Sequence, residues 1–315
     1  MRRRHWAFIV TGALWASLDS VRLAEAAEQT LRIVGADRMV PVVRALASRF
    51  GETRPGLNVD VGGGGSDAGV PALVNDAAAI AMLARPVTDT EIRYAHTALN
   101  KHLVGIPVAV DGVAVIVAPG NPMESLSLEQ LTAIFSAKVE SWDDVGVPRG
   151  GMGRARGDLH ADTTHPIRRH LPERDSGSIH IIERMALRGK RLAQSTLIYP
   201  DARSLAQAVA ADPLGIGFGG LASVKGVKVL AVQRDADTLA VAPSPATVRD
   251  RTYPLAHYLY LYFAGPPTGE AKEFLTFVLS PQGQQIVGRL DSGVAALPLS
   301  AGPAQDPSRG NDAGP

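Results

Sequence analysis

Short apolar runs alternate with segments of helical periodicity along the first hundred residues, and this alternation limits the folds open to the chain. The run LRIVGA (31–36) is rich in branched residues and ends in glycine, which favours a β-strand. The next segment, PVVRALASRF (41–50), has proline near its start and apolar residues at helical spacing. A second strand, LNVDV, and a second helix over 66–75 repeat the order. The pattern predicts an α/β fold with a largely parallel sheet.

The later part of the chain carries the same kinds of element. Two apolar runs within 106–122 are joined by an Asp-Gly step, which favours a turn or, equally, marks a crossing between domains. Ser127 is placed to cap a helix that follows it. The run HYLYLYFAG (257–265) predicts a strand, and an amphipathic helix after it is broken near Pro281.

The N-terminal segment has the features of an export signal. A basic start, MRRRH, precedes an apolar stretch, and Ala24-Glu25-Ala26 forms a cleavage site, so residues 1–26 are predicted to be a signal peptide. A membrane anchor is the alternative, but the apolar stretch is short for a bilayer. The sequence has no cysteine, which excludes disulfides and lipidation at a cysteine. We expect a protein of the periplasm, with a disordered Pro/Gly/Asp-rich tail over 300–315.

Composition excludes several classes of function. The net charge is +1 and no blocks of like charge occur, so nucleic-acid binding has no support. The histidines are scattered and form no His-Glu-x-x-His pattern, so we expect no metal site and no cofactor.

The glycine-rich stretch VDVGGGGSDAGVPALVND (59–76) is the first candidate for a binding site. Glycines allow a close approach to the backbone, and a helix N-terminus offers unpaired N–H groups and a partial positive charge. Gly65, Ser66 and Asp67 stand where such a helix begins, and the serine adds a hydroxyl donor. The stretch is therefore interpreted as an anion-binding loop, with a plain turn or linker as the alternative.

Several segments, in order, resemble the phosphate-binding periplasmic proteins of ABC importers, which belong to the type II solute-binding superfamily. The resemblance rests on an ordered combination and covers roughly Leu31 to Leu299. The segments that carry it are IVGADRMVPVVRALASRF, GGGGSDAGVPALVN, AAIAMLARPVTDTE, DGVAVIVAPGNPMESLSLEQLTAIFSAKVESWDDVG, RDSGSIH, RTYPLAHYLYLYF, SPQGQQIV and GVAALPL.

This resemblance implies a two-lobe periplasmic-binding-protein fold of type II, with two hinge crossovers and the ligand between the lobes. Lobe 1 is discontinuous and takes residues 27–108 and 248–299, while lobe 2 takes residues 109–247.

The resemblance also implies ligand contacts from a second loop. Arg174 matches an arginine that clamps phosphate, and its planar fork suits an oxyanion. Ser176, Gly177 and Ser178 lie in the same loop, and Ser178 matches the serine at the start of the next helix. The alternative is a solvated charged loop with a serine cap.

Departures from the family's pattern alter the expected site. Arg38, beside Asp37, replaces a threonine or serine, and His180 replaces a threonine. The family's acceptor aspartate is expected to align near Ala79 and a neighbouring serine near Ala84, so both groups are missing. We expect Arg38 to attract any anion, and discrimination between phosphate and sulfate to weaken unless Asp37 or Asp67 supplies an acceptor.

The function expected from these residues is capture of a small oxyanion, most plausibly phosphate or a phosphate-like anion, by a monomer that delivers it to ABC importer subunits. A periplasmic protein that reports its ligand to a membrane sensor is an alternative with the same lobes. A hydrolase is the remaining alternative, but no G-x-S-x-G pattern surrounds Ser176 or Ser178.

Overall fold

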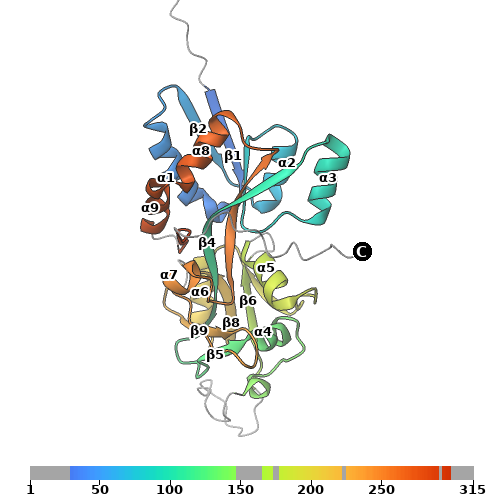
Figure 1. The fold of residues 1–315 in the computed structure, drawn as a ribbon. Helices are drawn as coiled ribbons and strands as arrows, with labels where there is room; N and C mark the ends of the chain where they lie inside the picture. Colours follow the sequence, from blue (N-terminus) through green and yellow to red (C-terminus); the bar gives the residue numbers. More distant parts are fainter. Residues whose placement is uncertain (1–28, 147–164, 173–176, 222–224, 291–292, 299–315) are drawn as a thin grey trace, which may run out of the picture.

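The computed structural model describes most of the chain between the predicted signal peptide and the predicted tail (Figure 1). The predicted signal peptide, the predicted tail, Arg174 and Ser176 lie outside the described residues. The described ranges are 29–146, 165–172, 177–221, 225–290 and 293–298.

The upper part of the molecule in Figure 1 is a sheet covered by helices. Its strands follow the order β2-β1-β3-β10-β4, in which the first three are parallel and β10 is antiparallel to both of its neighbours. The strands are β1 (Gln29–Gly35), β2 (Leu57–Gly62), β3 (Ile80–Leu83), β4 (Leu103–Val117) and β10 (Ala256–Ala264). The helices are α1 (Val40–Gly51), α2 (Ser66–Val74), α3 (Asp89–Leu99), α8 (Gly269–Leu279) and α9 (Pro281–Arg289), with a 3-10 turn, η1 (Asp37–Met39), before α1.

The lower part continues the same sheet from the second half of β4. The order runs β4-β8-β6-β7, with β9 paired to both β4 and β5. Its strands are β5 (Ser125–Ser127), β6 (Arg168–Pro172), β7 (Thr196–Tyr199), β8 (Gly215–Gly220) and β9 (Lys228–Gln233). Its helices are α4 (Leu128–Phe135), α5 (Gly177–Ile182), α6 (Ala202–Ala211) and α7 (Pro245–Arg249), with short turns η2 (Trp142–Val145) and η3 (Glu183–Leu187).

A single long strand, β4, crosses from the upper part to the lower part. It pairs with β10 from Leu103 to Gly112 and with β8 from Val113 to Val117. The Asp-Gly step therefore lies inside one strand at the crossing, and the turn that it also favoured is absent. Asp111 is the register partner of His257 on β10, so two polar side chains meet at this point.

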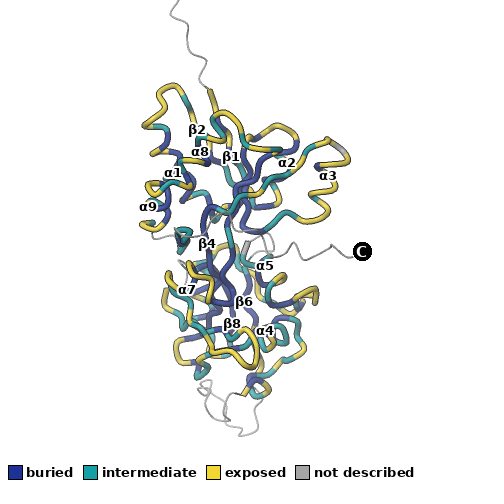
Figure 2. The backbone as a smooth tube through the Cα atoms, viewed as in Figure 1, coloured by how far each residue is buried: buried dark blue, intermediate teal, exposed yellow. Residues whose placement is uncertain are grey.

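Two large groups of buried side chains, one above and one below the crossing, form the core. The upper group includes Ile33, Leu46 and Phe274, and the lower group includes Phe135 and Trp142. In Figure 2 much of β4 and β8 is dark, while the outward parts of the helices are exposed. The α/β fold is thus two lobes, each with its own core.

The predicted lobe boundaries at 108/109 and 247/248 stay predictions. Near the second boundary, Val248, Tyr253 and Leu255 still pack into the lower core. The strand that returns to the upper lobe is β10, which begins at Ala256.

Local signals set several helix ends as the sequence predicted. Ser127 caps α4 in a capping box, since its hydroxyl accepts from the amide of Gln130. Ser280 ends α8 and caps α9, so the helix predicted to break near Pro281 is two helices.

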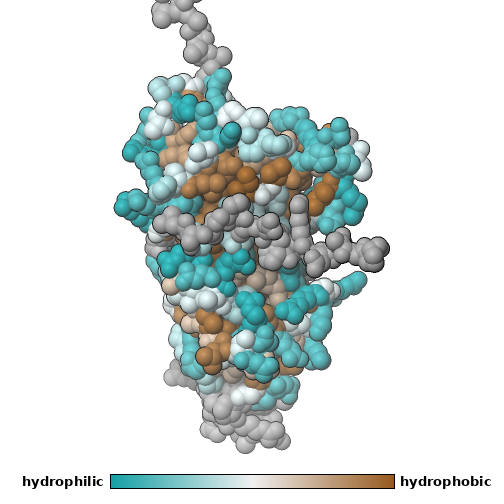
Figure 3. Space-filling view, in the orientation of Figure 1, coloured by the Kyte–Doolittle hydropathy of each residue, from teal (hydrophilic) through white to brown (hydrophobic). Residues whose placement is uncertain are grey.

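Hydrophilic side chains cover much of the face seen in Figure 3, with apolar side chains gathered on the upper lobe towards the middle of the molecule. Within the described ranges, helices of the length and apolarity needed to span a membrane are absent.

Gly35 ends β1 immediately before the turn that carries Asp37 and Arg38. Its φ is +148°, and a Cβ there would overlap the carbonyl oxygen of Met82 on β3. We expect Gly35→Ala to lower the free energy of unfolding by more than about 2 kcal/mol, because neither backbone can give way. Urea unfolding measures this. The control Gly51→Ala, where a Cβ meets nothing within 4 Å, should change stability by less than about 1 kcal/mol. Equal losses in the two variants would contradict this view of Gly35.

Candidate functional site

The glycine loop is held in place by the turn that follows β1. The loop connects β2 to α2, and Gly64 and Gly65 have φ of 113° and 81°, in the region that favours glycine. The amide of Gly64 donates to Asp37 Oδ1 at 3.0 Å. A Cβ on Gly63 would overlap that same carboxylate. The loop is therefore a fixed entry into α2 and not a linker between lobes.

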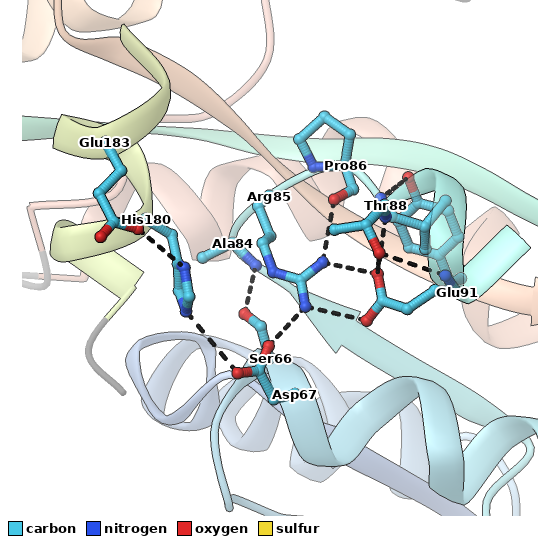
Figure 4. Close-up of polar contacts among 11 residues, drawn as sticks. Ser66, Asp67, Ala84, Arg85, Pro86, Thr88, Glu91, His180 and Glu183 are labelled. Carbon is cyan, nitrogen blue, oxygen red and sulfur yellow. Dashed lines mark hydrogen bonds and ion pairs between the residues drawn. The ribbon is translucent and has the colours of Figure 1, made fainter. Parts of the chain in front are cut away.

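Ser66 begins α2 and is only 5% exposed. Its Oγ accepts a hydrogen bond from the amide of Ala84 at 3.2 Å (Figure 4). Within the described part of the chain this hydroxyl accepts but has no acceptor for its own hydrogen, which leaves it able to donate. The structure thus brings Ser66 and Ala84 together, with the first amides of α2 beside them.

Ala79 does not lie at this site. Its amide donates to the carbonyl oxygen of Arg32 at 2.9 Å, before β3 begins. Because β3 is parallel to β1, the end of β3 that reaches the glycine loop is the Leu83–Ala84 end. The expectation that Ala79 marks the position of a lost carboxylate is therefore wrong, and the side chain that follows Ala84 is Arg85.

Arg85 holds two carboxylates together beside the loop (Figure 4). The side chain is 11% exposed; its Nη2 donates to Asp67 Oδ1 at 2.5 Å, and both terminal nitrogens donate to Glu91 at 2.8 and 2.9 Å. Burial alone would raise the pKa of Glu91, but hydrogen bonds from Arg85 and Thr88 lower it below its usual range. The group of Arg85, Asp67 and Glu91 therefore carries a net negative charge.

His180 faces this group from the lower lobe. Its Nε2 lies 3.8 Å from Asp67 Oδ2, and its Nδ1 lies 3.8 Å from Glu183 on the turn after α5. In Figure 4 the ring of His180 stands across from α2 and Arg85. The structure thus brings Asp67 and His180, both predicted from sequence, together at the boundary between the lobes.

Arg38 is paired with a carboxylate that the sequence prediction did not include. Its Nη2 donates to Asp111 Oδ1 at 2.7 Å and its Nε donates to Oδ2, while Asp111 is 1% exposed. Burial lowers the pKa of Arg38, but the charge and hydrogen bonds of Asp111 outweigh it and raise the pKa above its ordinary value. Asp111 offsets the charge of Arg38 in this arrangement, and a contact of Arg38 with an anion stays a prediction.

His257 completes the polar group at the crossing. It is buried, and its Nδ1 has no hydrogen-bond partner among the described residues. The pKa of His257 is lowered to about 4, mainly because burial disfavours the charged ring. The charge of Asp111 opposes this shift, and the charges of Arg38 and Arg184 add to it. His257 is therefore neutral at pH 7.

The other buried histidine of the described ranges has a carboxylate partner in the lower lobe. His170 lies 2.9 Å from Asp212 and 3.0 Å from the Tyr199 hydroxyl. His165, which is half-buried, lies 2.9 Å from Asp143. No three His, Asp or Glu side chains of the described residues are grouped as metal ligands.

The second predicted loop is described only in part. Gly177 and Ser178 begin α5, while Arg174 and Ser176 stay predictions because they lie outside the described residues. Sequence reasoning missed Asp111, Arg85 and His257. The available signal was polarity, since Asp111 is a lone carboxylate within a long apolar run and His257 opens another.

Two lobes joined by crossing strands, with polar loops from both meeting at their boundary, define a two-lobe binding protein. The chain belongs to the PBP superfamily domain family, whose model matches residues 21–282. This match confirms the resemblance and the fold class stated from the sequence.

Individual relatives carry more specific names. The chain is 26% identical to the phosphate-binding protein PstS of Pseudomonas aeruginosa, over 91% of this chain and 88% of that protein. It is 28% identical to PstS of Bacillus subtilis, over 85% and 81% of the two chains. It is 27% identical to protein SphX of Synechococcus elongatus, over 95% and 86%.

Solved structures share the fold. An ABC-type phosphate transport receptor from Vibrio cholerae superposes with a TM-score of 0.68 at 24% identity, covering 84% of this chain and 99% of that one. A putative phosphate ABC transporter substrate-binding protein with bound phosphate, from Clostridium perfringens, gives a TM-score of 0.66 at 22% identity, covering 86% and 100%. At these identities the likeness concerns the fold.

The buried His257 predicts how stability depends on pH. Its pKa in the folded chain, about 4, lies below the ordinary 6.5. Between pH 6.5 and pH 4, His257 is therefore protonated in the unfolded chain but neutral in the folded chain. This contribution is present above pH 6.5 and is lost as the pH falls towards 4, by roughly 3 kcal/mol. Urea unfolding gives the free energy of unfolding at pH 7 and at pH 4. The difference between these two values should be smaller in His257→Gln than in the wild type by about that amount. His96→Gln, which removes an exposed histidine of α3, is the control and should leave the difference unchanged. A His257→Gln variant with the wild-type difference would contradict the assignment.

Proposed function

We propose that this chain is a periplasmic receptor that binds a small oxyanion, phosphate or a phosphate-like anion, between its lobes and presents it to an ABC importer. Membership of the PBP superfamily supports this, as do relatives named phosphate-binding proteins. The observation that carries it is the fixed glycine loop, which ends in the buried Ser66 hydroxyl at the start of α2.

This loop has the donors that an oxyanion requires. The first amides of an α-helix have no partners within the helix, and its dipole adds partial positive charge. The Ser66 hydroxyl can donate in the same region, and Asp37 fixes the loop from its far side through Gly64. An oxyanion bound there replaces its water shell with donors already in position.

The charges around the loop favour an anion that carries a hydrogen. Asp67 has one oxygen held by Arg85, and its other oxygen faces His180 at 3.8 Å. Hydrogen phosphate can donate a hydrogen bond to such an oxygen, whereas sulfate has no hydrogen to donate and is repelled by the carboxylate. Asp67 thus takes the part of the acceptor that was expected near Ala79.

The protein acts by binding, as a monomer, and not by catalysis. Closure of the lobes removes water from the anion and changes the surface that the two lobes present together, which is what an importer recognises. The apolar N-terminal segment would direct the chain to the periplasm.

The first test is calorimetry of the mature protein with inorganic phosphate, arsenate, sulfate, a phosphonate and a small carboxylate. We expect phosphate to bind, and Ser66→Ala to weaken its binding about 10-fold, because one buried donor is lost. Ser48→Ala, which removes an exposed serine of α1, is the matched control and should bind as the wild type does. Unfolding of each variant is measured in parallel, since Ser66 also accepts from Ala84. A wild type that binds none of these anions would refute the proposed function.

The second test concerns the predicted clamp. We expect Arg174→Ala to weaken phosphate binding by at least ~2 kcal/mol, and Arg174→Lys to recover only part, because an ammonium cannot reproduce a two-pronged contact. Arg191→Ala, an exposed arginine of the same lobe, should have no effect. An unchanged phosphate affinity in Arg174→Ala would remove this residue from the site.

A further inference from the structure

The pair of Arg38 and Asp111 connects the turn beside the anion loop to the crossing strand β4. Arg38 directly follows Asp37, whose carboxylate holds the glycine loop, so its backbone belongs to the loops of the candidate site. Its side chain turns instead to Asp111, which lies 73 positions further along the chain on β4. The distance in sequence shows that this contact is a product of the fold and not of local chain geometry.

Both oxygens of Asp111 are occupied. Arg38 donates to Oδ1 and Oδ2, and the amide of Gly112 donates to Oδ1 at 2.7 Å. A two-pronged contact of this kind fixes the plane of the guanidinium as well as its position. The positive charge of Arg38 is therefore matched by a carboxylate that is almost completely buried.

Gly220 also lies against the guanidinium, on the strand next to β4, where it is the register partner of Val113. This glycine ends β8 in the lower lobe, and a Cβ on it would overlap Nη1, Cζ and Nη2 of Arg38. The guanidinium thus lies directly against the backbone of β8. It therefore contacts two paired strands, β4 through Asp111 and β8 through Gly220.

The neighbouring histidine cannot replace Arg38 as the partner of Asp111. His257 is the register partner of Asp111 on β10, yet burial keeps its ring neutral at pH 7. The carboxylate therefore depends on Arg38 for its balancing charge, and Arg38 depends on the carboxylate for its position.

We propose that Asp111 is a specificity-determining residue, which holds Arg38 and masks its charge so that the site does not bind anions on charge alone. An unmasked guanidinium beside the loop would attract any oxyanion, whether or not it carries a hydrogen. When Asp111 offsets this charge, the hydrogen-bond donors and acceptors of the site select the ligand by its shape and its protonation state. This inference rests on the proposed function, and it adds a residue that none of the predicted contacts includes.

The two residues should have opposite effects on anion binding. Asp111→Asn keeps the shape of the side chain but exposes the charge of Arg38, so sulfate and phosphate should both bind at least ~10-fold more tightly, and the preference between them should shrink. Arg38→Met leaves the buried carboxylate of Asp111 without a cation, so this variant should bind both anions more weakly by a similar factor. The double variant removes both charges and should lie within about 3-fold of the wild type.

Calorimetry of the full mature chain with inorganic phosphate and with sodium sulfate, in the wild type, both single variants and the double variant, is the test. Asp76→Asn is the control for net charge, because Asp76 pairs with Lys101 at the far end of α2; its anion affinities should match the wild type. Weaker or unchanged binding in Asp111→Asn would overturn the inference. So would a double variant that binds as poorly as Arg38→Met, because Arg38 would then contact the ligand itself.

If Asp111→Asn alone does not fold, the double variant is compared with Arg38→Met, because replacing both members of a buried ion pair is tolerated better than removing one. Recovery of anion binding in the double variant supports the inference, and no recovery overturns it. Sulfate-dependent thermal stabilisation is measured alongside. If the wild type binds no anion but Asp111→Asn is stabilised by sulfate, the proposed function fails and the masking role stands. If neither protein responds to either anion, both fail.

Discussion

The pairing of β4 with β10 is the contact on which the rest of the molecule depends. These two strands are antiparallel neighbours through the upper lobe and both continue into the lower core, so they connect the lobes and also set their relative position. One polar group at the boundary is placed directly by them. Asp111 and His257 lie on the strands themselves, and Arg38 reaches them from the turn after β1.

Charges around the candidate site are balanced largely within the chain. Arg38 is matched by Asp111, and Arg85 is shared by Asp67 and Glu91. A site built this way does not act as a positive patch. Among the described residues, the donors left for a ligand are backbone amides and a hydroxyl, whose directions are fixed by the loop and by α2. The predicted clamp, Arg174, lies outside these residues.

The sequence predicted the elements of the fold well, because hydrophobic periodicity and caps are local signals. The strand and helix order from β1 to α2, the cap at Ser127 and the break at Pro281 all follow from a few adjacent residues. Ser66 and Asp67 were singled out because a glycine-rich helix start is visible locally, and Asp37 and His180 because of the family resemblance. The structure ties Asp37 to the glycine loop and brings Asp67 and His180 together, while their contacts with a ligand stay predictions.

The partners of those residues could not be predicted in the same way. Arg38 and Asp111 are far apart in sequence, and an Asp-Gly step within an apolar run gives a turn signal whether or not the strand continues. Ala79 was assigned to the site although it precedes β3, whereas Ala84, which follows β3, lies at the site. The two positions are five residues apart, at opposite ends of a short strand.

The position of β10 also governs how the molecule can be assembled. This strand comes late in the chain, yet it lies between β3 and β4 in the middle of the sheet. Until residues 256–264 are available, β3 and β4 have no neighbour on their facing edges, and the upper core lacks Leu259, Leu261 and Phe263. Completion of the upper lobe therefore waits for nearly the whole polypeptide, and its central strand pairs depend on contacts between residues far apart in the sequence.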